Sequence, residues 1–362
     1  MSDFDISIAA FGAAGDGIAD DTAAFETAIA SCQDTGKTLH LHPGRRYSIR
    51  RELVITTDKS LRIDGHGATL IADAPMRSLL ALLGGAFVQC REVTFHGGRL
   101  AQFALYSVRG GQSRFSDCVF YFGLVDSVRL ASGGLAGGND CMQFFDCEMS
   151  RSGQSHTVTV TCPASNNSDE PVLDLGIDTS RVTAGDLLKV GDYIGQVAGV
   201  PEPGKVRMKR LPALPALEGA SGTLFCGYGY REEAYNDNNL VVLRDCTLRA
   251  NGCGGALLGG LYGARLQSVQ SDFNGLAGFV VGILGDVAPI GTSFRDCYSE
   301  DHVLDFLFAH ANGVEISTFN GPGTMATLNP SFAYGTFINL QGQPGLKNIC
   351  PNKVVHNLIG VP

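Results

Sequence analysis

The feature that most restricts what this chain can fold into is an internal repeat. Copies begin at five places: RFSDCVFYFG at Arg114, QFFDCEMSRSG at Gln143, VLRDCTLRANG at Val242, RLQSVQSDFNG at Arg265 and SFRDCYSEDHV at Ser293. They share a large apolar residue, a free position, then Asp and Cys (Ser and Val in the fourth copy), followed by a turn and a second apolar stretch. A looser copy begins at Cys90, with Val93 in the cysteine position. Short β stretches that repeat without helical periodicity predict the coils of a solenoid.

The spacing of the copies supports a solenoid interior filled by like side chains. Equivalent positions are 25 residues apart between Val93 and Cys118, and 28 apart between Val269 and Cys297. Coils about 4.8 Å apart would stack equivalent side chains without voids. The 11 cysteines are an odd number without zinc-type spacing, so we expect buried, reduced thiols. The two interior stacks we expect are Phe115, Phe144, Leu243, Leu266 and Phe294, and Cys118, Cys147, Cys246, Val269 and Cys297.

One interval breaks the repeat. Cys147 and Cys246 are 99 residues apart, which is 70 more than the 29 between Cys118 and Cys147. This interval contains short alternating stretches separated by Gly and Pro, so we expect a small inserted β domain. Its ends, marked by Cys162 and Cys226, should lie close together. The boundaries we expect are a capping segment over 1–36, the first part of the β-helix over 37–162, the insert over 163–229, the second part over 230–345 and a tail over 346–362.

The N-terminal segment predicts a cap for the open end of the solenoid. It reads FGAAGDGIADDTAAFETAIASC from Phe11, and Asp21 or Thr22 can cap a helix there. A strand, KTLHLHPGRRYSI, follows. These residues, about 45 in all, closely resemble the start of the pectate-lyase-like superfamily. That superfamily includes polysaccharide lyases, glycosidases of the polygalacturonase type, epimerases and phage tailspike depolymerases.

The resemblance, together with the repeat, implies the fold class. We expect an all-β chain, a right-handed parallel β-helix with an N-terminal capping helix and a small inserted all-β domain. The resemblance implies action on a polysaccharide but selects no reaction, because one fold hosts several chemistries. We interpret Asp16, Asp20 and Asp21 in the motif as turn and cap residues, not as catalytic groups.

Composition excludes several partners. The net charge of −9 argues against a dedicated nucleic-acid binder, and the lack of an 18-residue apolar run argues against membrane insertion. The first ten residues lack a signal-peptide pattern, so we expect synthesis in the cytosol and use on a virion, such as a phage tail, or outside the cell. The segment SEDHVLDFLFAH from Ser299 is rich in metal-ligand types, but strand alternation sends them to different faces. We therefore expect no metal and no cofactor.

One candidate face lies on the strand after the Gly turn. There Asp126 and His156 would be outward neighbours on successive coils, able to act as acid/base partners, with Arg129 nearby to bind substrate. Asp305 would share the column but lie about 19 Å away, too far for a carboxylate pair with Asp126. The alternative is that Asp126 satisfies turn amides and His156 anchors the neck of the insert.

A second candidate face precedes the turn. Its outward column is Tyr121, Ser150, Arg249, Asp272 and Glu300, beside a column of Glu148, Thr247, Gln270 and Tyr298. Asp272 and Glu300 would be one coil apart, close enough for a hydrolytic carboxylate pair. Their proximity should raise one pKa, which suits a general acid. We expect Arg249, Tyr298, Glu148 and Tyr121 to bind substrate; the alternative is a solvated ladder of mixed charges.

The sequence therefore favours a polysaccharide depolymerase, an endo-acting glycoside hydrolase that cuts a surface or capsular glycan in a groove along the β-helix. A uronate lyase or epimerase is the enzymatic alternative, since Arg249 and Tyr298 suit a sugar carboxylate. A glycan-binding virion or surface protein without catalysis is the third. The apolar tail from Val354 to Pro362 suits a partner surface, so we expect a homotrimer; the alternative is a monomer capped by its own tail.

Overall fold

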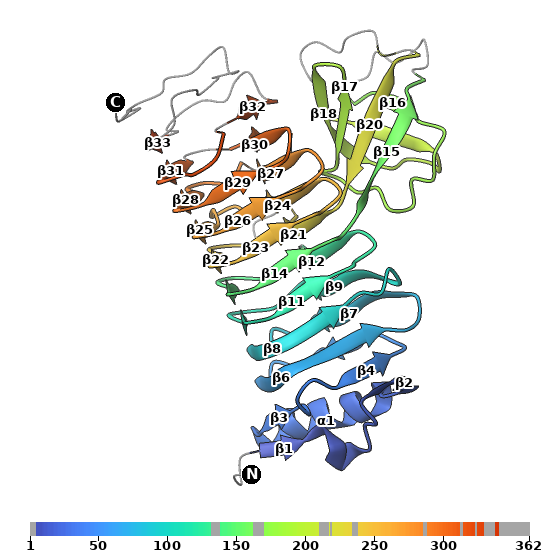
Figure 1. Cartoon of the computed structure of the whole chain (residues 1–362), viewed down its shortest axis with the longest axis vertical. Helices are drawn as coiled ribbons and strands as arrows, with labels where there is room; N and C mark the ends of the chain where they lie inside the picture. Colours follow the sequence, from blue (N-terminus) through green and yellow to red (C-terminus); the bar gives the residue numbers. More distant parts are fainter. Residues whose placement is uncertain are drawn as a thin grey trace.

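The chain is a right-handed parallel β-helix, which confirms the predicted fold class (Figure 1). The computed structural model describes residues 5–131, 138–161, 170–209, 217, 219–233, 238–284, 288–311, 314–322, 324–328 and 337–339. The N-terminal end of the solenoid carries the helix α1 (Thr22–Thr35), and a small antiparallel sheet lies beside the C-terminal half. No helix in the described ranges is long and apolar enough to cross a membrane.

Each repeat forms one coil of three strands. In the coil from Arg114, β10 (Arg114–Ser116) and β11 (Val119–Tyr121) belong to an 18-stranded sheet, and β12 (Asp126–Leu130) belongs to a nine-stranded sheet. The corner between the first two strands is Asp117, with a left-handed φ of 54°. Asp tolerates this conformation better than most residues, which explains the Asp before each Cys of the repeat. The same corner recurs at Asp146, Asp245 and Asp296, with φ of 52–55°.

The strands follow this pattern along the whole solenoid. The other strands of the 18-stranded sheet are β1 (Asp5–Ser7), β2 (Asp16–Asp20), β3 (Thr38–His40), β4 (Arg46–Ile49), β6 (Leu61–Ala72), β8 (Val88–His96), β13 (Gln143–Phe145), β14 (Glu148–Ser150), β22 (Val242–Arg244), β23 (Thr247–Arg249), β25 (Arg265–Gln267), β26 (Gln270–Asp272), β28 (Ser293–Arg295), β29 (Tyr298–Glu300), β31 (Glu315–Ser317) and β33 (Phe337–Asn339). The nine-stranded sheet adds β5 (Leu53–Ile55), β7 (Met76–Leu82), β9 (Ala101–Ser107), β21 (Tyr228–Glu232), β24 (Gly254–Leu258), β27 (Ala277–Val281), β30 (Leu304–Phe308) and β32 (Met325–Thr327).

Both predicted interior stacks are present. The register joins Phe115 to Phe144, and their rings stack with centroids 5.4 Å apart. The four cysteines of the second stack are buried and free. Each thiol donates to a carbonyl of the preceding coil, as from Cys118 Sγ to the Cys90 oxygen at 3.6 Å and from Cys246 Sγ to the Phe144 oxygen at 3.4 Å. The cysteines therefore act as small apolar core residues that also satisfy backbone acceptors.

The N-terminal segment caps the solenoid as expected. A 3-10 turn (η1, Ile8–Phe11) precedes β2, and α1 buries Phe25 against Tyr47 of β4, with ring centroids 5.1 Å apart. Asp21 is the N-cap residue of α1, but its carboxylate accepts from the amides of Ala14 and Gly15 instead of from the helix. Asp16 and Asp20 also accept from nearby amides. These contacts agree with turn and cap roles for the three acids.

The insert leaves the solenoid inside one coil, after β14, and returns at β21. Its six-stranded sheet consists of β15 (Gln154–Thr159), β16 (Val172–Asp174), β17 (Leu187–Val190), β18 (Tyr193–Gly199), β19 (Lys205–Met208) and β20 (Ser221–Cys226). The two ends pair antiparallel from Gln154–Cys226 onward. At this neck Gly153 has φ of 66°, and a Cβ there would lie 2.0 Å from the Cys226 oxygen. The antiparallel sheet thus begins before residue 163 and ends before residue 229. Cys162 and the tail over 346–362 lie outside the described residues.

Candidate functional site

The second face has the register that the repeat predicts. On adjacent coils Arg249 of β23 pairs with Asp272 of β26, and Asp272 pairs with Glu300 of β29. Gln270 and Tyr298 are likewise partners in the neighbouring column. Adjacent parallel strands lie about 4.8 Å apart. The two carboxylates therefore start from neighbouring backbone positions on one side of the sheet.

Asp272 occupies an unusual environment for a carboxylate. Its side chain is on a solvent-facing column, yet the residue is only 5% exposed. The Oδ1 atom is buried and has no hydrogen-bond partner within the described structure, while Oδ2 accepts from Gln270 Nε2 at 3.4 Å. Burial raises the pKa of Asp272, the charge of Glu300 raises it further, and Arg249 opposes both. Asp272 is thus the group of this face best suited to hold a proton.

Glu300, Tyr298 and Arg249 complete the surroundings of Asp272. Glu300 is half-buried, and Arg249 is exposed. A hydrogen bond to Glu300 is the main cause that raises the pKa of Tyr298 to about 12. The Tyr298 hydroxyl therefore stays protonated at neutral pH and can donate. Together these residues offer one nearly buried carboxyl with a raised pKa, a second carboxyl, one phenol donor and one guanidinium.

Sequence reasoning missed His302 as a member of this site. Its side chain is fully buried, and Nε2 forms a hydrogen bond with Ser299 Oγ at 2.6 Å and lies 3.5 Å from Asp305 Oδ1. Its Nδ1 has no partner within the described structure. Charge on His302 acts to lower the pKa of Asp272. His302 follows Asp301, a corner residue with φ of 57°, so simple strand alternation does not predict its direction.

Tyr121 and Glu148 lie on the same face toward the N-terminal end. Tyr121 is in the column of Arg249 through Ser150, and Glu148 pairs with Thr247. The Tyr121 ring packs on His96 with centroids 4.4 Å apart. Glu148 Oε1 accepts from Ser150 Oγ at 2.6 Å. They thus lie on the same sheet face as Asp272, on earlier coils, and are not in contact with the pair.

The first face differs from our prediction, because Asp126 is not exposed to solvent. Asp126 is fully buried and accepts from Tyr228 N at 2.8 Å, Arg231 Nε at 3.1 Å and Arg129 Nη1 at 3.2 Å. Arg129 also donates to Glu233. The physical reason is the insert, which covers this face: Asp126 shares Arg231 with Asp186 of the insert, and all three side chains are fully buried. Asp126 and Arg129 therefore belong to a buried ionic network at the root of the insert.

His156 and Asp305 also need correction. His156 lies in the insert, where it pairs with Leu224 of β20 and Gln154 Nε2 donates to its ring at 2.8 Å. The coil neighbour of Asp126 is instead Tyr228, as follows from the pairing of Val128 with Tyr230. Asp305 is 1% exposed. Burial acts to raise the pKa of Asp305, but hydrogen bonds from His302 and Thr324 outweigh it and lower that pKa.

One group of metal-ligand types gathers elsewhere within the described ranges. Ligand atoms of His40, Asp64 and His66 lie within 4.8 Å of one another. However, His40 Nδ1 is hydrogen-bonded to His66 Nε2 at 3.1 Å, His40 Nε2 to Asp5 at 3.0 Å, and Asp64 Oδ2 accepts from Arg91 at 2.6 Å. These contacts engage most of the atoms that a metal ion would need.

Comparisons with known proteins show the fold alone. No protein-family model and no curated protein matches the chain. Among solved structures, the A-module of mannuronan C-5 epimerase AlgE6 from Azotobacter vinelandii aligns with a TM-score of 0.53 and 13% identity, over 94% of this chain and 77% of that chain. The N-terminal fragment of bacteriophage Phi29 gene product 12 aligns with a TM-score of 0.52 and 12% identity, over 93% and 57%.

A Geobacillus virus E2 protein, ORF18, aligns with a TM-score of 0.46 and 11% identity over 93% of this chain. This chain spans 61% of the length of that protein and 57% of the Phi29 fragment.

Proposed function

We propose that this protein is an endo-acting glycoside hydrolase with Asp272 and Glu300 as its acid/base pair. The observation that carries the proposal is the contrast between the two carboxyls on adjacent coils. Asp272 is nearly buried with a raised pKa, whereas Glu300 is half-buried beside a phenol donor. Two carboxyls whose surroundings separate their pKa values are the usual arrangement for one acid and one base or nucleophile.

The reaction assigns one role to each group. Asp272 gives its proton to the glycosidic oxygen as the bond from that oxygen to the anomeric carbon breaks. Glu300 either takes a proton from the attacking water or forms a bond to the anomeric carbon, which water then cleaves. The first route needs carboxyls about 6.5–9.5 Å apart and the second about 5–5.5 Å. Side chains on strands about 4.8 Å apart can meet either separation, so product stereochemistry decides between them.

The test is a reducing-end assay on a panel of capsular and cell-surface glycans. The proposal expects new reducing ends without the absorbance of an unsaturated uronate. Release with that absorbance identifies a lyase instead. Binding without any new reducing end on a glycan that the protein retains contradicts the enzyme and identifies a binding protein.

A uronate lyase or epimerase is the second candidate, and Arg249 is the observation that favours it. Its guanidinium is exposed beside Asp272, where it can hold a sugar carboxylate by paired hydrogen bonds. A lyase or epimerase needs a deprotonated base to remove a proton from the sugar. The pKa of Tyr298 is about 12, so its phenol is protonated at neutral pH and can donate a proton but not accept one. The hydrolase does not need Tyr298 as a base.

We also propose that the protein acts as a homotrimer on a virion or outside the cell. Sedimentation of the full chain distinguishes a trimer from the 38.2 kDa monomer.

A further inference from the structure

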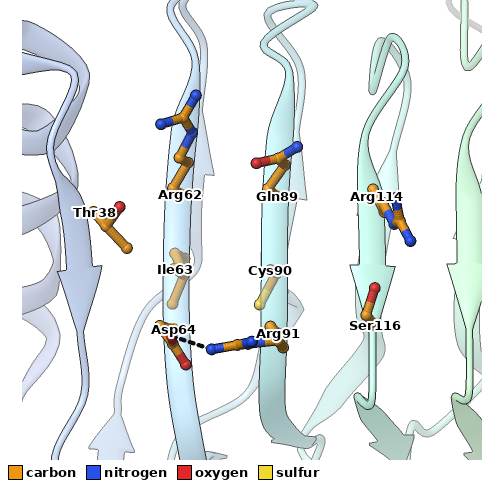
Figure 2. Close-up of a pocket in the computed structure, with 9 residues that line it drawn as sticks. All are labelled: Thr38, Arg62, Ile63, Asp64, Gln89, Cys90, Arg91, Arg114 and Ser116. Atoms are coloured by element: carbon orange, nitrogen blue, oxygen red, sulfur yellow. Dashed lines mark hydrogen bonds and ion pairs between the residues drawn. The ribbon is translucent and has the colours of Figure 1, made fainter.

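A pocket lies on a different face from Asp272, across the first strands of the early coils. It has a volume of about 340 Å³ and crosses β3, β6, β8 and β10. Figure 2 shows two rows of side chains on these strands, Thr38, Arg62, Gln89 and Arg114 in one row and Asp64, Arg91 and Ser116 in the other. The size is within the range of small-ligand pockets.

Two guanidiniums of the pocket have no ion pair within the described structure. Arg62 and Arg114 pair through Gln89, which lies between them in the same column. Both arginines are exposed, and none of the ion pairs of the described residues includes either. Two strand spacings separate their backbones by about 10 Å. A ligand the size of one sugar residue, lying over the Gln89 amide, can therefore extend from one cation toward the other.

The other charges of the pocket leave these two cations available. Asp64 Oδ2 is held by Arg91 at 2.6 Å, the contact drawn in Figure 2, so this pair is neutral as a unit. Asp117 lies at the corner beyond β10 and is exposed, but no ion pair joins it to Arg114 in the described structure. The whole chain carries a net charge of −9, whereas this pocket is locally positive, which favours an anionic ligand there.

Arg114 is also held in place before any ligand binds. Its guanidinium lies over the Phe145 ring, 4.4 Å from the centroid, and Arg244 lies 4.3 Å from the same centroid. Phe145 is only 8% exposed, so the ring serves as a support rather than as a surface for sugar stacking. A cation held by such a contact loses less side-chain freedom on binding.

We propose that this pocket binds one anionic sugar residue that lies between Arg62 and Arg114, with its carboxylate on one guanidinium and its hydroxyls on the other guanidinium, Gln89 and Ser116. Guanidinium is the cation best matched to a carboxylate, and the amide of Gln89 and the hydroxyl of Ser116 suit sugar hydroxyls. The pocket would be a second glycan-binding site, separate from the acid/base pair. The proposal rests on the pocket's own residues and does not depend on hydrolysis at Asp272.

The test is a titration of the full chain with glucuronate, glucose and inorganic phosphate, followed by saturation-transfer NMR. We expect glucuronate to bind at least tenfold more tightly than glucose. Arg62→Gln and Arg114→Gln should each weaken glucuronate binding about tenfold or more, since each removes a charged hydrogen-bond donor. Arg265→Gln is the matched control: Arg265 occupies the same column, is exposed and lies outside the pocket, so this variant should bind as the unaltered chain does.

Three results would overturn the proposal. The first is equal binding of glucose and glucuronate. The second is unchanged glucuronate binding in both Arg62→Gln and Arg114→Gln, with circular dichroism showing intact folds. The third is tighter binding of phosphate than of glucuronate through the same two arginines, which identifies a phosphate site. Asp272→Asn separates this proposal from the enzymatic one: it should keep glucuronate binding, and its loss there would place the ligand at the acid/base pair instead.

Discussion

The root of the insert is held by a fully buried ionic network whose centre is Arg231. Its Nε donates to Asp126 at 3.1 Å, its Nη2 to Asp186 at 2.5 Å, and its Nη1 to the Ala184 carbonyl at 2.8 Å. The side chains of Arg231, Asp126 and Asp186 all have zero exposure. Asp126 belongs to the solenoid and Asp186 to the insert. Arg231 therefore joins the two parts through charges that water cannot screen.

Replacement of Arg231 by Met should destabilise the protein strongly at pH 7. The change leaves two buried carboxylates without their shared cation, and removal of one partner from a buried ion pair costs about 3–5 kcal/mol. Asp126 keeps Arg129 and the Tyr228 amide, whereas Asp186 keeps neutral donors such as the amides of Thr183 and Gly227. For 362 residues this cost corresponds to a decrease of about 4–7 °C in Tm, from an unfolding entropy of about 2.1 cal/mol/K per residue.

The pH dependence has a definite sign. Burial raises the pKa of Asp186 even in the presence of Arg231, which opposes the shift. A carboxyl with a raised folded-state pKa favours folding below its unfolded pKa, about 3.9, and that contribution is lost as pH rises through the folded value. Loss of Arg231 enlarges the shift. The deficit of Arg231→Met relative to the unaltered chain should therefore be larger at pH 7 than at pH 4.

Guanidinium titrations followed by circular dichroism measure both quantities. Arg265→Met is the control, because Arg265 is exposed and outside any ion pair of the described residues, and it should shift stability by less than about 0.5 kcal/mol. Adding Asp186→Asn to Arg231→Met should recover part of the loss, since it removes one stranded charge. An Arg231→Met protein as stable as the unaltered chain at pH 7, or one with a larger deficit at pH 4, would refute the network account.

Three further predictions follow from the same contacts. Burial raises the pKa of Cys118 well above its usual value, so we expect thiol reagents at pH 8 to label it in denaturant but not in the native protein; rapid native labelling would contradict the buried stack. Gly153→Ala should cost about 2 kcal/mol or more in a chemical denaturation assay, whereas Gly67→Ala, with a similar φ of 75° but open space around its Cβ, should cost only about 1 kcal/mol. If Asp272 is the acid, kcat/KM should fall as pH rises through its pKa, which burial raises above the usual pKa of an aspartate. A value of kcat/KM that still increases with pH in that range would exclude Asp272 as the acid.

The repeat made the fold and the second face predictable for one reason. The Asp corner and the Cys stack fix the register of the first two strands in each coil, so counting from Cys246, Val269 and Cys297 places Arg249, Asp272 and Glu300 correctly. The third strand follows a connection of variable length. Strand alternation also does not show what covers a strand: the insert's network buries Asp126, and contacts with His302 and Thr324 enclose Asp305.

Other parts of the site depend on contacts that a linear pattern does not contain. The position of His156 depends on where the insert leaves the coil, at the Gly153 neck. The raised pKa of Asp272 depends on burial by neighbouring coils. The pocket did have a sequence signal, since an arginine precedes the apolar residue in two of the five copies, at Arg114 and Arg265, but only the fold shows that Arg62 and Arg114 border one hollow.

The most direct test of the central claim is the turnover of Asp272→Asn and Glu300→Gln on a glycan that the unaltered chain cuts. Each substitution keeps shape and removes the ability to donate or accept the proton, so each should lower kcat by about 10²–10⁴ without changing the thermal unfolding midpoint by more than a few degrees. Asp296→Asn is the matched control, because Asp296 is an exposed acid at the corner of the same coil and should keep full turnover. Loss of turnover in the first two variants but not in the third is the predicted result; full turnover in Asp272→Asn and Glu300→Gln would contradict the assignment of this pair.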